Sequence, residues 1–456
     1  MNKKRILMVF IHIILIFIIN IFAFEETELK GYGMFYLLYS SFTFICLVKI
    51  QKKIITPINI LYGAFVLFQS GVPIAYFIKE NYYNYYITLF PKEIVLDAAK
   101  YTLWSIEAFS FALIVFLKTR NIKKKNIIFS KVAALNNDAH VFSIARIIFI
   151  VTSIVMLPLY AYVAFLSVRL GFSQEIRSIV ASNSFFNLIK AFFFPSFFLL
   201  VCYARERTFT KIASYIFILM CILALLSGNR TDGVLWLLTY FYYNKSADKG
   251  TIFNKIIVLF GVIAIVFVAV YIGQTRIGKT ASGATSILIS LIGEMGFNFF
   301  SICFVMMYVP SARAFLLGSS YVESIICMIP KSLDFLHVFD SMRNSLPAQW
   351  LYNINHERFG SLLDFGTGFS MIGESYMNFS WAGFLMSALY AFMLCKVFNG
   401  QWNVDSKWGK YIQMTFFLGL LTFPRRGFIE FLNVISYSIF FLTLILVLTY
   451  KKKRIN

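Results

Sequence analysis

The chain has 456 residues, of which 59% are hydrophobic and only 14% are charged. With a mean hydropathy of +0.74, this composition excludes a soluble globular protein, a disordered chain and a secreted disulfide scaffold. The net charge of +21 would suggest nucleic-acid binding in a soluble protein. In a membrane protein it is typical of basic loops on the cytoplasmic side, so we expect no nucleic-acid partner.

Apolar runs long enough to cross a bilayer recur from one end of the chain to the other. They predict an all-α, polytopic transmembrane helix bundle that forms a single integral-membrane domain over residues 1–456. Fourteen spans are predicted, near 6–24, 34–48, 58–78, 98–117, 141–166, 184–203, 212–227, 233–244, 256–273, 286–308, 315–330, 376–398, 411–424 and 428–450. The number falls to twelve if 286–308 and 315–330 form a re-entrant pair, because 315–330 is short and partly polar.

The distribution of Lys and Arg predicts which ends of the spans face the cytoplasm. Basic residues precede the first span, follow the second, fourth, sixth and eighth spans, and occupy 451–454. Both termini are therefore expected to be cytoplasmic, which requires an even number of spans. The longest polar stretch, about 331–375, then lies on the outer face, where a long loop often carries function.

Arg makes up more than half of the basic residues on the outer face of this topology, whereas Lys dominates inside. Arg binds phosphate and carboxylate through a rigid, two-pronged guanidinium, which Lys lacks. An outer cluster of Arg at the membrane edge therefore indicates a lipid phosphate or pyrophosphate ligand, although such side chains can also simply reach lipid headgroups. The candidates are Arg169, Arg177, Arg230, Arg276, Arg425 and Arg426.

Two of these positions are the most informative. Arg230 stands in the short turn SGNRTDG, where Gly and Asn alone would explain the turn and Asp232 could pair with the Arg. Arg425 and Arg426 are adjacent in the outer turn PRRGF, against the orientation rule. They are either ligands for an anion or interfacial anchors for the last two spans.

Three side chains are candidates for a general base. Glu374 lies near the outer end of a span, and Glu294 fits such a place less well; each could instead form an ion pair with an Arg. His356 stands in the polar run NINHERF, in which a lone His is often just solvated. No HExxH, P-loop or GxSxG motif is present, and no DxD pair is evident in an outer loop. We therefore expect no metal and no cofactor, with Arg supplying the positive charge.

Several segments of the chain resemble the O-antigen and capsular polysaccharide polymerases, the Wzy family of oligosaccharide repeat unit polymerases. The most specific piece is GESYMNF at 373–379. The segments that carry the resemblance are SGNRTDG at 227–233, QTRIG at 274–278, IGEMGFN at 292–298 with YVP at 308–310, GSSYVES at 318–324 and IP at 329–330, GTGFSMIGESYMNFSWAGF at 366–384, and PRRGF at 424–428.

The resemblance implies a bacterial, multi-pass glycosyltransferase of the cytoplasmic (inner) membrane that works on the outer face. Its substrates would be oligosaccharide repeat units carried on undecaprenyl pyrophosphate, joined into the O-antigen of lipopolysaccharide or into capsule. Membrane lipid surrounds such an enzyme, and a protein that regulates chain length is a further candidate partner. The Arg candidates would hold the pyrophosphate leaving group, and Glu374, Glu294 or His356 would accept the proton of the acceptor hydroxyl.

Two other functions remain open at this point. An O-antigen ligase would use the same donor but transfer the glycan to a lipid core. A transporter or flippase of lipid-linked sugars would predict internal repeats and charged or broken helices near mid-membrane. The sequence shows no repeat, and the Arg candidates lie at span ends.

Overall fold

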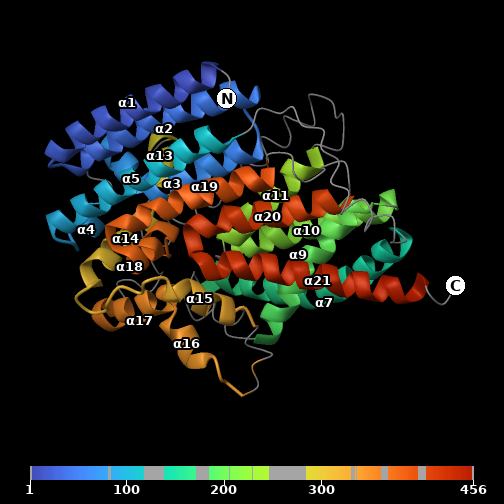
Figure 1. Ribbon diagram of the computed structural model, residues 1–456. Coiled ribbons are helices and arrows are strands. Elements are labelled where there is room, and N and C mark those ends of the chain that lie inside the picture. Colours follow the sequence, from blue (N-terminus) through green and yellow to red (C-terminus); the bar gives the residue numbers. More distant parts are fainter. Residues whose placement is uncertain are drawn as a thin grey trace.

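The computed structural model describes residues 3–80, 84–117, 138–170, 184–204, 206–227, 230–245, 284–329, 334, 336–360, 368–398 and 407–453 (Figure 1). Within these ranges all regular structure is helical and no strand occurs, which confirms the predicted all-α class. The helices are α1 (Lys3–Glu25), α2 (Leu29–Gln51), α3 (Pro57–Ile78), α4 (Asn84–Ile87), α5 (Lys92–Phe116), α7 (Asp138–Leu170), α9 (Ser184–Cys202), α10 (Arg207–Leu226), α11 (Arg230–Lys245), α13 (Ala284–Met295), α14 (Asn298–Tyr308), α15 (Ser319–Ile326), α16 (Asp340–Ser345), α17 (Pro347–Phe359), α18 (Met371–Phe379), η3 (Ser380–Phe384), α19 (Leu385–Phe398), α20 (Lys407–Arg426) and α21 (Phe428–Lys453).

Nine helices among the described residues are long and apolar enough to cross a membrane. Each predicted span in those residues falls on helical structure, with one exception, although 286–308 is divided between α13 and α14, and 376–398 between α18, η3 and α19. The span 256–273 lies outside the described residues. The exception is 315–330, where the prediction of a span is wrong. Helix α15 has 8 residues and is about 12 Å long, far short of the roughly 30 Å of a hydrocarbon core. The total of 12–14 spans stays a prediction.

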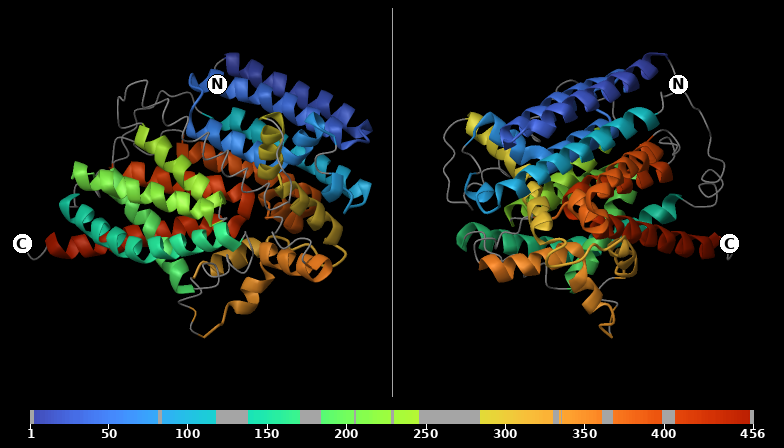
Figure 2. Two further views of the ribbon diagram at one scale, coloured as in Figure 1. Left: turned by 180° about the vertical axis from the view of Figure 1, so that it is seen from behind. Right: turned by 60° about the vertical axis from the view of Figure 1, so that its left-hand side comes forward.

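Both described ends of the chain lie on the same side of the bundle, as the right-hand view of Figure 2 shows. Helices α15, α16 and α17 lie away from those ends, at the lower left of Figure 1. This arrangement agrees with an even number of spans. That the termini face the cytoplasm and that 331–375 forms an outer loop remain predictions.

Helix α20 joins the two halves of the bundle. It packs against α3 on one side and against α9 and α11 on the other. Around it the core is aromatic: the ring of Phe109 lies 4.2 Å from that of Phe65 and 5.3 Å from that of Tyr390. Such rings bury large areas and hold helices in fixed register. The end of α20 is therefore close to a tightly packed aromatic core, since Phe423 also packs against Tyr390 at 5.3 Å.

Two glycines let α13 cross α3 at backbone contact. A Cβ atom on Gly71 would lie 2.2 Å from the carbonyl oxygen of Ile292, and one on Gly296 would lie 2.3 Å from Cα of Gly71. Small residues allow this close approach between membrane helices. The contact places the beginning of α14 beside the middle of α3, where Asn298 and Gln69 reach the end of α20.

Candidate functional site

The turn between α20 and α21 carries the adjacent cations Arg425 and Arg426. Gly427 separates the two helices, with a φ of +84° that favours glycine. A Cβ atom on Gly427 would lie 2.9 Å from Oε2 of Glu374 and 2.9 Å from the ring of Phe369. The turn therefore requires glycine for two reasons, its backbone conformation and the closeness of Glu374.

Glu374 is 2% exposed and lies in the first turn of α18. Its Oε2 atom accepts the backbone N–H of Phe428 at 2.8 Å, and its Oε1 atom accepts the hydroxyl of Ser320 at 3.1 Å. Phe428 is the first residue of α21, whose N–H has no partner within the helix. A carboxyl group at this helix N-terminus is also favoured by the helix dipole. Glu374 thus fixes the start of α21 relative to α15 and α18.

Proline shapes the end of α20. Pro424 has no N–H to donate, which leaves the carbonyl of Leu420 without its helical partner. The hydroxyl of Tyr390 donates to that carbonyl instead. The carbonyl of Pro424 itself accepts the side-chain amides of Gln69 at 2.6 Å and of Asn298 at 3.4 Å. Side chains from α3, α14 and α19 therefore replace the hydrogen bonds that the helix lacks.

Helix α15 is joined to α18 by a second set of hydrogen bonds. The amide of Asn378 donates to the hydroxyl of Ser320 at 2.8 Å, and its oxygen accepts the N–H of Gly318 at 2.9 Å. Backbone bonds from Leu316 and Leu317 to the carbonyls at 377 and 378 continue the contact. The GSSYVES and GESYMNF segments, which are far apart in the sequence, are one structural unit around Glu374.

The two cations lie at the edge of this hydrogen-bonded network. Arg425 is partly buried, with its guanidinium carbon 5.6 Å from the centre of the Phe68 ring. Arg426 forms an ion pair with Glu430 at 3.8 Å, one helical turn further on. Positive charge is thus presented on a turn whose backbone is held from several sides, an arrangement suited to binding a phosphate group.

The other predicted site residues lie elsewhere or outside the described residues. Glu294 is partly buried in the last turn of α13, beside the crossing with α3. Arg169 is exposed near the end of α7, over the ring of Phe165 at 5.9 Å. Arg230 begins α11, but its side chain is not among those described, and Arg177 and Arg276 lie outside the described residues.

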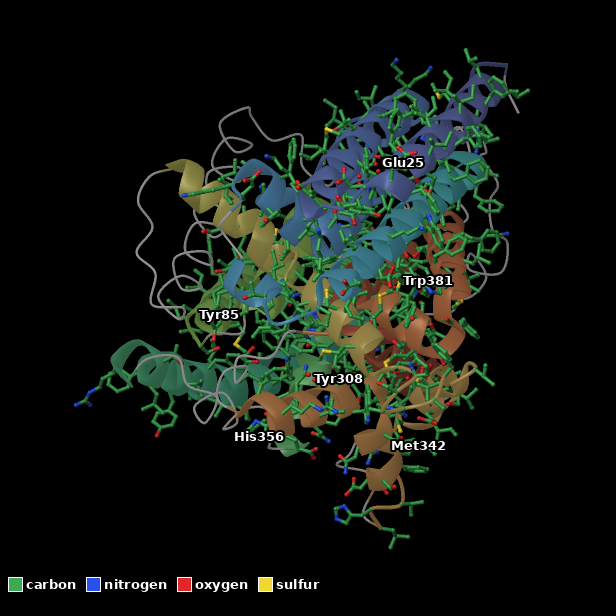
Figure 3. All side chains as sticks on the ribbon, turned by 90° about the vertical axis from the view of Figure 1, so that its left-hand side faces the viewer. Glu25, Tyr85, Tyr308, Met342, His356 and Trp381 are labelled. Atoms are coloured by element: carbon green, nitrogen blue, oxygen red, sulfur yellow. The ribbon has the colours of Figure 1, made fainter. Side chains whose placement is uncertain are left out.

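His356 is exposed on α17, where its ring stacks on that of Tyr352 at 6.0 Å. Figure 3 shows it near Tyr308, with α16 projecting below. Neither His356 nor Arg169 bonds to the Glu374 carboxyl, whose hydrogen bonds within the described residues come from Ser320 and Phe428. Of the predicted residues, the structure therefore unites Glu374 with the Arg425–Arg426 turn.

Some residues of the site have no counterpart among the sequence candidates. Gln69 joins the Ser370 hydroxyl, which donates to its oxygen at 2.6 Å, to the carbonyl of Pro424. The sequence signal for Gln69 is a single amide side chain inside an apolar span. Such a group usually forms hydrogen bonds with other helices. Arg313, between α14 and α15, is a further cation that the sequence candidates omit, with its guanidinium carbon 5.1 Å from the centre of the Trp350 ring.

The described residues contain no group of three or more His, Cys, Asp or Glu side chains placed to hold a metal ion. Neither a curated protein nor a solved structure matches the chain. The family model of the O-antigen polysaccharide polymerase Wzy matches residues 6–454, nearly the whole chain. Because the match spans all of the helices around the Glu374 network, this multi-pass membrane protein belongs to the O-antigen polysaccharide polymerase Wzy family.

Proposed function

We propose that the protein joins oligosaccharide repeat units carried on undecaprenyl pyrophosphate into O-antigen or capsular polysaccharide. The reaction takes place at the outer face of the bacterial cytoplasmic membrane. The growing glycan is the donor: the bond between its reducing-end sugar and the pyrophosphate breaks. A hydroxyl at the non-reducing end of a fresh lipid-linked unit forms the new glycosidic bond and loses its proton. Undecaprenyl pyrophosphate leaves.

The observation that carries this proposal is the Arg425–Arg426 turn, held in place by Gln69, Asn298 and Glu374. Negative charge grows on the pyrophosphate as the sugar leaves. Cations on a fixed backbone stabilise that charge without having to reorganise during the reaction. In this proposal the Arg side chains supply the positive charge that a metal ion supplies in other transferases.

The remaining outer Arg residues complete the pyrophosphate site in this proposal. Arg230 begins α11, directly after α10, and Arg169 lies near the end of α7. Both stand at helix ends, where a cation can reach the polar headgroup layer. Arg177 and Arg276 are assigned to the same task from the sequence alone. A bidentate contact from any of them would add to the charge stabilisation by Arg425 and Arg426.

Glu374 is assigned a positioning role, because both of its oxygens are bonded to the protein and the side chain is buried. The proton acceptor is then Glu294 or His356. Glu294 lies in the last turn of α13 and is partly buried, whereas His356 is exposed on α17. General-base assistance of this kind is worth about 10²–10⁴-fold in rate.

The proposed function is tested by separating surface and lipid-linked glycans from cells that lack the protein. A polymerase predicts single repeat units at the surface in place of a ladder of lengths. Polymer that forms but stays on its lipid carrier would identify a ligase. Lipid-linked units that accumulate on the inner face would identify a flippase. Co-purification of a chain-length regulator with the wild-type protein is a separate check on partners.

A further inference from the structure

Helix α15 has its polar side inward and its apolar side outward. Ser320 and Ser324 are fully buried, and the Ser320 hydroxyl takes part in the Glu374 network. On the opposite side, Val322 is 59% exposed and Ile325 is 51% exposed. Ile326 and the flanking Leu317 are also exposed. A helix at a water-facing surface has the reverse pattern, so the outward face of α15 is suited to contact hydrocarbon.

Helix α15, whose apolar face we define as Leu317, Val322, Ile325 and Ile326, lies beside the beginning of α21, directly after the cationic turn of Arg425 and Arg426. Helix α15 packs against α21, and the ring of Tyr321 lies 5.2 Å from that of Phe428, two residues after Arg426. Helix α15 is too short to span a bilayer. It therefore lies beside the first turn of α21, next to Arg425 and Arg426.

This juxtaposition suits an amphiphile with a diphosphate headgroup. A ligand of that kind needs cations for its phosphates and, at the point where the phosphates join the chain, an apolar surface for its first isoprene units. The cationic turn supplies the cations, and the apolar face of α15 supplies the surface for the isoprene units. The hydrogen bonds of Ser320 and Asn378 hold the two at a fixed spacing.

We propose that the apolar face of α15 binds the polyisoprenoid chain of the lipid-linked saccharide, while Arg425 and Arg426 bind its diphosphate. The inference rests on the proposed function and adds the element that recognises the carrier lipid. Bulk phospholipid can cover the same face, but its binding is independent of the saccharide. The carrier chain, by contrast, is covalently attached to the saccharide. If it binds the α15 face, that face takes part in substrate recognition.

The test uses the full-length protein in phospholipid vesicles and a double variant, Val322→Asn with Ile325→Asn. The matched control is Val151→Asn with Ile154→Asn on α7, which has the same residue types at the same spacing and comparable exposure of 57% and 67%. Polymerisation is measured with one saccharide diphosphate on two carriers, a long polyprenyl chain and a short, water-soluble methyl ester that has no isoprene unit.

We expect the α15 variant to raise KM for the long carrier by about tenfold and to leave KM for the short carrier unchanged. The α7 control should change neither. Equal KM values for variant and wild type on the long carrier would show that the face contacts bulk lipid only, and would overturn the proposal. An equal rise in KM for both carriers would show that the α15 face has only a structural role. This result would overturn the proposal as well.

A second measurement does not depend on polymerisation. A photoreactive polyprenyl diphosphate that lacks sugar should crosslink to α15 in the wild-type protein. Excess unlabelled polyprenyl diphosphate should suppress the crosslink, whereas excess phosphatidylglycerol should not. Equal suppression by both would overturn the proposal. Crosslinking by a wild-type protein that makes no polymer would instead contradict the proposed function and leave the lipid site standing.

Discussion

The backbone N–H of Phe428 donates to Oε2 of Glu374 at 2.8 Å, across 54 residues of sequence. The bond joins the first residue of α21 to the first turn of α18. Through Oε1 the same carboxyl holds Ser320 of α15. A single side chain therefore sets the relative position of three helices around the two arginines, and its substitution separates a positioning role from a chemical one.

Replacement of Glu374 by Gln tests that distinction. The amide oxygen can accept the N–H of Phe428, and the amide NH2 can donate to Oγ of Ser320, whose proton then loses its present acceptor. The contacts that join α18 to α15 and α21 are retained. We expect Glu374→Gln to keep most of the polymerisation rate, measured in vesicles. If Glu374 were a general base, the same substitution would lower the polymerisation rate by about 10²–10⁴-fold.

Glu374→Ala should have a much larger effect than Glu374→Gln. It leaves the N–H of Phe428 and the hydroxyl of Ser320 without their present acceptor. Each such loss costs about 1–3 kcal/mol in a buried place. We expect lower thermal stability in detergent and loss of polymer. If the Ala variant were as active as the Gln variant, the network would have no part in positioning the arginines.

Gly427→Ala should abolish the glycan ladder. The substitution places a Cβ atom against Glu374 and forces alanine into a positive φ. Gly419→Ala, within α20, is the control, since its Cβ would meet neighbours no closer than 3.4 Å. The measurement is the ladder at matched amounts of protein. A normal ladder from the Gly427 variant would mean that the turn can adopt another shape without loss.

Removal of either cation from the turn should slow polymerisation by about 10²–10³-fold, by analogy with other fixed charge-stabilising groups. Arg425→Ala and Arg426→Ala should act on kcat with little change in protein stability. Arg146→Ala is the control: this residue pairs with Glu206 near the beginning of α10, away from the turn. Full activity in both turn variants would remove these arginines from the mechanism.

The segment before α16 should lose its structure at acid pH. Burial acts to raise the pKa of the Asp334 carboxyl, but hydrogen bonds from Phe339, Arg343 and Val338 outweigh it and lower the pKa. The stabilisation is fully present above the unfolded pKa of about 3.9 and is lost as pH falls through the lower folded value. Pepsin cleavage near 334–343 should therefore begin to increase as the pH falls below about 3.9 and should be greatest below the lowered pKa of folded Asp334.

Asp334→Asn provides the matched control for the acid experiment. The amide keeps the shape of the side chain but removes the ion pair with Arg343 at 2.6 Å. Cleavage of this variant should be rapid at every pH at which pepsin acts. If cleavage of the wild-type protein did not change with pH, contacts other than those of Asp334 would hold the segment, and the prediction would be wrong.

The helices were predictable because the length of an apolar run is set by the thickness of a bilayer. The error at 315–330 has the same origin. Hydropathy averages the residues of a segment and does not distinguish Ser320 and Ser324, which face inward, from Val322 and Ile325, which face outward. A short helix with an apolar outer face therefore resembles a poor span in sequence.

The site was predictable only in part. The excess of Arg on the predicted outer face indicates Arg425 and Arg426, and the resemblance indicates the segment of Glu374. The structure brings these residues together, and their functional roles stay a prediction. Gln69 and Tyr390 were missed because each is one polar group within an apolar helix. Their importance arises from partners on α20 that are far away in sequence. Spacing along the chain carries no information about such contacts.

The hydrogen bonds that hold the Arg425–Arg426 turn have a consequence for biogenesis. Gln69, Asn298 and Glu374 are all synthesised before α20, and helices of a growing chain enter the membrane largely in order. The Arg425–Arg426 turn can acquire its shape only after α20 and α21 have packed against the helices that carry these three residues. An incompletely inserted chain therefore lacks the arranged turn, so the proposed site forms only once the last two helices have entered the membrane.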